Sequence, residues 1–93
     1  MNTNGIELGQ VVRSKAGRDR DAYFVVVSFQ ESQYLYIADG NKRRIDRPKK
    51  KKVKHLARTG IVLQDIAEKL KNGKKVTNAD LRRHLKNLNP ESI

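Results

Sequence analysis

The sequence predicts a mainly β protein with C-terminal helices, in which a small barrel of short strands precedes a helical hairpin. Two observations predict this class. The first half of the chain carries short runs of β-branched and aromatic residues between glycine-containing turns, and after residue 60 the apolar residues recur at helical spacing. The 93 residues allow one such domain with an appendage, and we expect the barrel over residues 6–58 and the hairpin over residues 61–89.

Three strands are expected near the N-terminus. Residues 9–14 are a short run that begins with a glycine. Residues 23–29 carry apolar side chains at both odd and even positions, so both faces of that strand are apolar. Residues 34–38 follow a short polar turn. Pro48 should interrupt the later ladder, and residues 53–56 are short enough to be a closing strand. The strand patterns predict a core that includes five side chains: Val12, Phe24, Val26, Leu35 and Ile37.

The Asp39-Gly40 pair is the strongest hairpin signal in the chain, because a type I′ turn needs positive φ at both central residues. A two-residue turn there would place Tyr36 opposite Arg43 and Leu35 opposite Arg44. Tyrosine rings would then lie beside guanidinium groups on a face that could stack on unpaired bases. The alternative is that each tyrosine only covers the barrel surface.

The last third of the chain changes to a helical period. Asn72-Gly73 is a plausible stop for the first helix. Four apolar residues before it fall on one helix face: Leu63, Ile66, Ala67 and Leu70. Asn78 is the expected N-cap of a second helix, which ends before Pro90 and carries a leucine stripe: Leu81, Leu85 and Leu88. Two short amphipathic helices cannot bury their stripes alone, so we expect them to pack on each other and on the barrel.

Positive charge is concentrated in one central segment. Lys and Arg total 21 against 10 Asp and Glu, which gives a formal net charge of +11, and ten of the basic residues lie in residues 41–60 beside a single aspartate. Such an excess indicates a polyanionic partner, because each neutralised phosphate releases condensed counterions. Ile45, Val53 and Leu56 interleave with the charges and favour an ordered binding face over a solvated one.

Other classes of protein are disfavoured by the same composition. The absence of cysteine excludes disulfides and thiolate metal sites, and the longest apolar run, residues 22–27, is too short to span a bilayer. Residues 1–5 have no signal-like pattern, so we expect a cytoplasmic protein. The chain has only two histidines, His55 and His84, and it has neither paired carboxylates nor a glycine motif that could cradle a phosphate. We therefore expect no enzymatic activity, cofactor, metal or small-molecule substrate. We also expect a monomer.

Residues 9–21 read Gly-Gln-Val-Val-Arg-Ser-Lys-Ala-Gly-Arg-Asp-Arg-Asp. This segment resembles the KOW motif of large-subunit ribosomal proteins and NusG-type elongation factors. Gly9 and Gly17 stand at its two glycines, and Val12 matches the apolar strand. The resemblance implies that Arg18 and Arg20 occupy the basic loop that touches RNA in relatives.

The chain departs from this motif at Ser14, where many members carry an aliphatic residue, and at Asp21, where a further glycine is usual. The whole chain is similar to the small bacterial KOW-domain RNA-binding proteins related to the archaeal and eukaryotic ribosomal protein L14e. The turn at residues 37–40 and the lysine-rich residues 48–52 add to that match. The resemblance implies an SH3-like barrel, RNA binding and association with the ribosome.

The expected partner is therefore structured RNA, in particular ribosomal RNA. The candidate RNA-binding residues are polar or aromatic side chains of the motif loop and the central segment: Arg13, Lys15, Arg18, Arg20, Tyr36, Lys42, Arg43, Arg44, Arg47, Lys49, Lys50, Lys51, Lys52, Lys54, His55 and Arg58. Among them, Arg43, Arg44 and residues 49–52 should form the main phosphate-binding surface, with Arg18 and Arg20 as a second contact. A folded fragment ending near Arg58 should keep most of the affinity.

Two other functions remain open at this point. Residues 63–72 and 77–87 would form the helix-turn-helix of a DNA-binding regulator, with four polar side chains facing the major groove: Asn78, Arg82, Arg83 and Lys86. Against that reading, the charge is densest outside these helices and the connection at residues 73–77 is long for the motif. A KOW-type domain would also suit a protein-interaction module in transcription elongation.

Overall fold

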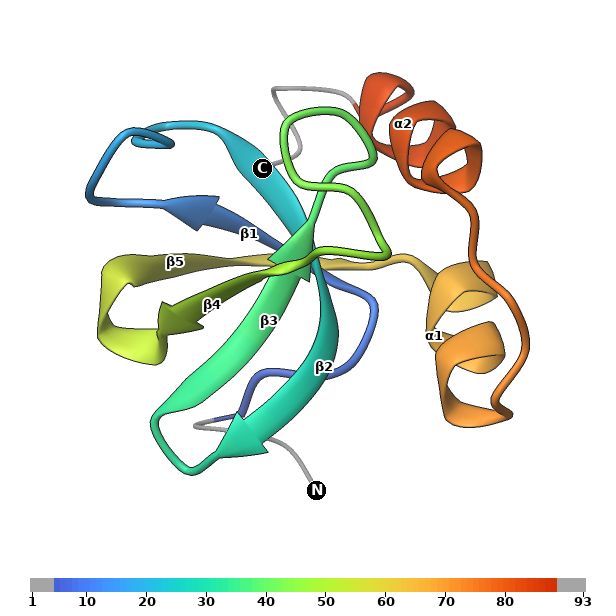
Figure 1. Cartoon of the computed structure of the whole chain (residues 1–93), viewed down its shortest axis with the longest axis horizontal. Helices are drawn as coiled ribbons and strands as arrows, with labels where there is room; N and C mark the ends of the chain where they lie inside the picture. Colours follow the sequence, from blue (N-terminus) through green and yellow to red (C-terminus); the bar gives the residue numbers. More distant parts are fainter. Residues whose placement is uncertain (1–4, 89–93) are drawn as a thin grey trace.

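The computed structural model describes residues 5–88, and it is a five-stranded antiparallel sheet followed by two helices (Figure 1). Along the chain, the strands are β1 (Gln10–Ser14), β2 (Tyr23–Glu31), β3 (Tyr34–Ala38), β4 (Lys49–Lys52) and β5 (Leu56–Val62). Their order across the sheet is β4-β3-β2-β1-β5. A 3₁₀ turn, η1 (Val53–His55), joins β4 to β5, and the helices are α1 (Gln64–Lys71) and α2 (Asn78–Lys86). The predicted mainly β class with C-terminal helices is confirmed.

The sheet is strongly curled, because its two outermost strands are joined by a single short turn. Four strand spacings in a flat sheet would separate β4 from β5 by roughly 19 Å. The three residues of η1 join these strands, and four extended peptide steps reach roughly 14 Å at most. The sheet must therefore bend until its edges approach each other.

Alternating side chains of the strands enter two separate cores. The concave face buries one cluster: Ile6, Val12, Phe24, Val26, Leu35, Ile37 and Leu56. The other face buries strand residues against the helices: Val11, Val25, Val27, Ala38, Leu63, Ile66, Val76 and Leu81. The five predicted core residues are all fully buried, and all belong to the concave cluster.

The helices lie on the outer face of the sheet, on the right in Figure 1. Helix α1 buries Ile66 and Ala67, and the chain leaves it through Gly73, which has the positive φ of +67° expected at a stop. The predicted N-cap of α2 is wrong by one residue. Thr77 is the N-cap, and it forms a capping box with Asp80.

The connection after β3 is a ten-residue loop, residues 39–48, and the predicted two-residue turn is wrong. Tyr36 pairs with Lys50 and Leu35 pairs with Lys51, so the arginines expected opposite them lie in the loop. Of the Asp39-Gly40 pair, only Gly40 has a positive φ. A type I′ turn requires both, so this hairpin cannot be one.

The strand predicted at residues 53–56 is also placed differently. Residues 53–55 form η1, and β5 begins at Leu56 and continues to Val62. The sheet therefore extends past the predicted boundary at residue 58, and residue 89 of the predicted hairpin lies outside the described residues. Within residues 5–88, no helix is long and apolar enough to cross a membrane.

Candidate nucleic-acid interface

The β1–β2 loop, residues 15–22, is shaped by two residues in the left-handed region. Gly17 has φ +80° and Asp21 has φ +70°. Asp21 donates its backbone N–H to the Ser14 carbonyl at 2.7 Å and pairs with the Arg13 guanidinium at 2.9 Å. Asp is among the few residues other than glycine that adopt this conformation readily. The departure from the KOW pattern at Asp21 therefore retains the backbone geometry that a glycine would give.

The other departure, Ser14, is fully buried at the end of β1. Its hydroxyl donates to the Ala16 carbonyl at 3.0 Å, so the buried oxygen is satisfied inside the loop. A hydroxyl here replaces aliphatic packing with a hydrogen bond that bends the chain into the loop.

The β3–β4 loop, residues 39–48, is held from within by Asp39. Its carboxylate accepts the backbone N–H groups of Asn41 at 2.9 Å and Arg43 at 2.8 Å. The Arg43 carbonyl in turn accepts the N–H groups of Asp39 at 2.9 Å and Gly40 at 3.0 Å. An aspartate that bonds its own following backbone in this way stabilises a turn.

Helix α2 supports the same loop from outside. The Ile45 N–H donates to Asn78 Oδ1 at 2.7 Å, and Arg82 Nη1 donates to the Gly40 carbonyl at 2.7 Å. A Cβ at Gly40 would lie 2.3 Å from the Asn78 carbonyl oxygen, so the loop and the helix are in direct backbone contact. Loop 39–48 is therefore positioned by the helices as well as by the sheet.

An ion pair joins the two loops. Arg43 donates from Nε at 2.9 Å and from Nη2 at 2.8 Å to Oδ2 of Asp19, whose side chain is 7% exposed. Arg43 itself is 30% exposed. Charge-assisted hydrogen bonds of this length are among the stronger polar contacts in proteins, and this pair holds loop 15–22 against loop 39–48.

Two further contacts join loop 15–22 to the β4–η1 segment. Lys51 Nζ donates to the Ala16 carbonyl at 3.1 Å, and the Lys15 N–H donates to the His55 carbonyl at 2.8 Å. Loop 15–22, loop 39–48 and residues 49–55 thus meet in one surface, which we call the basic surface. The two RNA contacts that the sequence predicts separately are adjacent in the fold.

Most of the predicted residues on the basic surface are exposed, and seven of them make no side-chain hydrogen bond or ion pair within residues 5–88: Lys15, Arg18, Arg20, Lys42, Arg47, Lys49 and Lys54. Arg44 is also exposed, with an ion pair to the exposed Asp46 at 3.6 Å. Such side chains can exchange solvent for phosphate at little cost. Arg13, Arg43 and Lys51 are engaged within the protein, as described above, and the Arg58 guanidinium lies against Gly5.

Tyrosine and lysine alternate on the outer face of β3 and β4. Lys50 Nζ lies 4.6 Å from the Tyr34 ring centre and Lys52 Nζ lies 5.7 Å from it, both within cation–π range. The Tyr36 hydroxyl donates to Gln30 Oε1 at 2.7 Å, and its ring packs at the edge of the outer core. The predicted contact between Tyr36 and Arg43 is therefore wrong, and the aromatic ring that lies beside basic groups is that of Tyr34, with lysines as its neighbours.

Two residues that organise the site were missed in the sequence. Asp19 was not singled out, although an acidic residue between Arg18 and Arg20 in a basic loop is a signal for an internal ion pair. Tyr34 was not among the predicted binding residues, although the predicted hairpin placed it on the same face as Tyr36 and Arg43.

The four residues expected to face DNA in a helix-turn-helix have other neighbours. Asn78 and Arg82 bond loop 39–48, as described above. Arg83 pairs with Asp80 at 3.2 Å, and Lys86 is exposed. In residues 5–88, no three His, Asp or Glu side chains are placed to share a metal ion.

Neither a scan against protein-family models nor a search of curated proteins finds a match to this chain. The KOW resemblance therefore stays a prediction, and the geometry and charge of the basic surface are the features that indicate a function.

Proposed function

We propose that this chain binds structured RNA, in particular ribosomal RNA, through the basic surface and without catalysis. The observation that carries the proposal is the bridge from Asp19 to Arg43, which brings the two loops richest in unpaired cations side by side. Phosphate groups are the natural counterpart of exposed Lys and Arg held on a stable support. We further propose that the chain acts as a monomer in the cytoplasm and associates with the ribosome.

We further propose that the sheet is an SH3-like barrel of the KOW type. A five-stranded antiparallel sheet in the order β4-β3-β2-β1-β5, with its outermost strands joined by one 3₁₀ turn, is compatible with closure into an SH3-like barrel. Together with the motif at residues 9–21, this arrangement favours a KOW-type domain of the L14e-like family. In that fold the motif loop is a natural place for RNA contact, and here it carries Arg18 and Arg20.

RNA is preferred over duplex DNA because of where the free cations lie. The helix-turn-helix reading needs α2 to enter a major groove, which requires a free face. Asn78 and Arg82 instead bond the protein's own loop. Loops held by internal hydrogen bonds, together with strands that carry cations beside an aromatic ring, suit the irregular surface of folded RNA.

A salt titration of RNA binding tests the proposal. The chain is titrated by fluorescence anisotropy with a ribosomal RNA hairpin, and about five phosphate contacts predict a slope of log affinity against log salt of about −3 to −5. A quadruple variant, R18Q/R20Q/R44Q/R47Q, should stay folded and flatten the slope by about two units or more.

The matched control removes the same charge from the helical part of the chain: K71Q/K74Q/K75Q/K86Q. Its slope should change by less than about one unit, because these residues lie outside the basic surface. Equal changes in the two variants would contradict the proposed surface. Crosslinking in cells, followed by sequencing of the bound nucleic acid, should give a ribosomal RNA peak, and a spread of genomic DNA contacts would favour the DNA-binding reading instead.

A further inference from the structure

A polar groove lies between the β2–β3 turn and the junction of β4 with η1. It has a volume of about 470 Å³ and is lined by five residues: Ser32, Gln33, Lys52, Val53 and Lys54. This volume is within the range of sites that hold small ligands. The groove is held in shape by the backbone, because the Val53 N–H donates to the Gln33 carbonyl at 2.9 Å.

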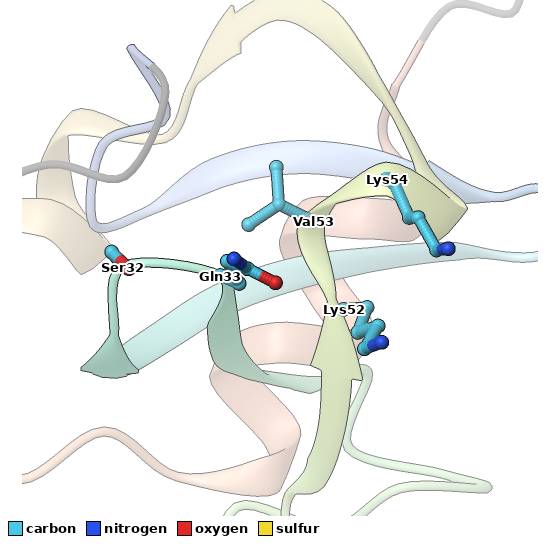
Figure 2. Close-up of a pocket in the computed structure, with 5 residues that line it drawn as sticks. All are labelled: Ser32, Gln33, Lys52, Val53 and Lys54. Atoms are coloured by element: carbon cyan, nitrogen blue, oxygen red, sulfur yellow. The ribbon is translucent and has the colours of Figure 1, made fainter.

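Figure 2 shows how the lining side chains divide. Val53 points toward Ser32 and Gln33, whereas Lys52 and Lys54 project together from the other side of the chain. Within residues 5–88, the Gln33 carboxamide and the Ser32 hydroxyl have no hydrogen-bond partner. The apolar contact and the free amide thus lie on one side of the segment at residues 52–54, and the two ammonium groups lie on its other side.

This combination matches the parts of a nucleotide. A base needs an apolar contact for its ring face and a donor and acceptor for its edge, which Val53 and the Gln33 carboxamide offer. The phosphates that flank the base need cations on flexible stems, which Lys52 and Lys54 offer. Tyr34 is next to Gln33 in the chain but does not line the groove, and its ring lies within cation–π range of Lys50 and Lys52.

We propose that this groove binds one unpaired nucleotide of the RNA held by the basic surface, and that Gln33 reads the edge of its base. The inference rests on the proposed function, because the basic surface supplies most of the affinity. Residues 52–54 continue directly from the lysines of β4, so an RNA helix on the basic surface can place a bulged or terminal nucleotide in the groove. The protein would then recognise a helix with an interruption and distinguish it from a continuous one.

The test compares a hairpin that carries a single-nucleotide bulge, prepared with each of the four bases, with an uninterrupted hairpin of the same stem. The full chain should bind the best bulged hairpin at least about fivefold more tightly, which is the lower range of what one stacked base contributes. Q33A should bring the four bulged hairpins within about twofold of each other, while its affinity for the uninterrupted hairpin stays unchanged. The matched control is Q64A, an exposed glutamine at the start of α1 outside the groove, and it should keep the base preference.

Nuclear magnetic resonance gives a second readout that does not depend on affinity. The side-chain amide signals of Gln33 should shift on addition of the bulged hairpin and not on addition of the uninterrupted one. If the unaltered chain binds both hairpins equally, or if Q33A and Q64A behave alike, the groove does not bind a nucleotide. The proposal that the basic surface binds RNA would still stand in that case. If the unaltered chain binds neither hairpin, the proposed function itself is wrong.

Discussion

Arg43 and Arg44 are adjacent in the chain and have different surroundings. Arg43 donates two hydrogen bonds to the buried carboxylate of Asp19, and Arg44 is exposed beside the equally exposed Asp46. A charge that is already paired gains less from a phosphate than a charge that faces solvent. Arg43 therefore acts mainly on the arrangement of the loops, and Arg44 is free to contact the RNA that we propose as the partner.

Replacing each arginine by glutamine should separate these two roles. R43Q should lower the free energy of unfolding by about 2 kcal/mol, because it leaves the Asp19 carboxylate buried without its charged donor. R44Q should change stability by less than about 0.5 kcal/mol, as is usual for an exposed site, and should weaken RNA binding. Denaturant unfolding and RNA titration of both variants check this prediction. Equal losses of stability would contradict the structural role of Arg43.

At the scale of the element, the start of α2 is stabilised by a reciprocal pair of hydrogen bonds. The Asp80 N–H donates to Thr77 Oγ1 at 3.0 Å, and the Thr77 N–H donates to Asp80 Oδ2 at 3.0 Å. That backbone bond is the main cause of a lowered pKa for the Asp80 carboxyl, with smaller contributions from Lys69 and Arg83, while burial acts in the opposite direction. The ionised carboxylate is therefore the form that the folded helix prefers.

The lowered pKa predicts how stability depends on pH. Because the folded pKa lies below the unfolded value of roughly 3.9, the contribution of Asp80 is fully present above that pH and is lost as the pH falls through the folded pKa. D80N should be less stable than the unaltered chain at neutral pH, and the difference should shrink in acid. Unfolding curves between about pH 2 and pH 7 measure this. D46N, at an exposed aspartate that caps no helix, is the matched control. Equal losses of stability in D46N and D80N at neutral pH would contradict the capping role.

The elements that could be predicted are those determined by local pattern. The β3 range and the five-residue core follow from the strand patterns, and the end of α1 shortly before Gly73 follows from the conformational freedom of that glycine. The connection after β3 could not be predicted, because its form depends on distant partners. Gly40 lies against the Asn78 carbonyl, 38 positions later in the chain, and no local signal encodes that contact.

The candidate site shows the same division. Charge density identified the segment that forms the basic surface, since net charge is a property of composition. Which of its cations are free could not be read from the chain, because the pairing of Arg43 with Asp19 joins loops 24 positions apart. The sequence therefore predicts the region of contact better than it predicts the role of each residue in it.

At the scale of the whole molecule, the helices cover the outer face of the sheet and also position loop 39–48. Four strand residues depend on them for burial: Val11, Val25, Val27 and Ala38. The expectation from sequence that a fragment ending near Arg58 would bind RNA assumes that the barrel folds without them. Val62 pairs with Gln10 in the last part of β5, so such a fragment would also cut a strand of the sheet.

We predict that even a chain ending at Val62, which keeps all of β5, does not fold cooperatively. Truncation removes four buried partners of the outer face: Leu63, Ile66, Val76 and Leu81. Burial of one large apolar side chain contributes about 1.5–3 kcal/mol, so the combined loss is comparable to the total stability of about 5–15 kcal/mol of a typical domain. Thermal unfolding followed by circular dichroism should show no cooperative transition for this fragment, whereas the full chain should unfold in a cooperative transition. A cooperative transition and dispersed amide signals in the shorter chain would contradict this prediction and would mean that the sheet is an independent domain. RNA titration of that fragment would then measure the affinity of the basic surface without its helical support.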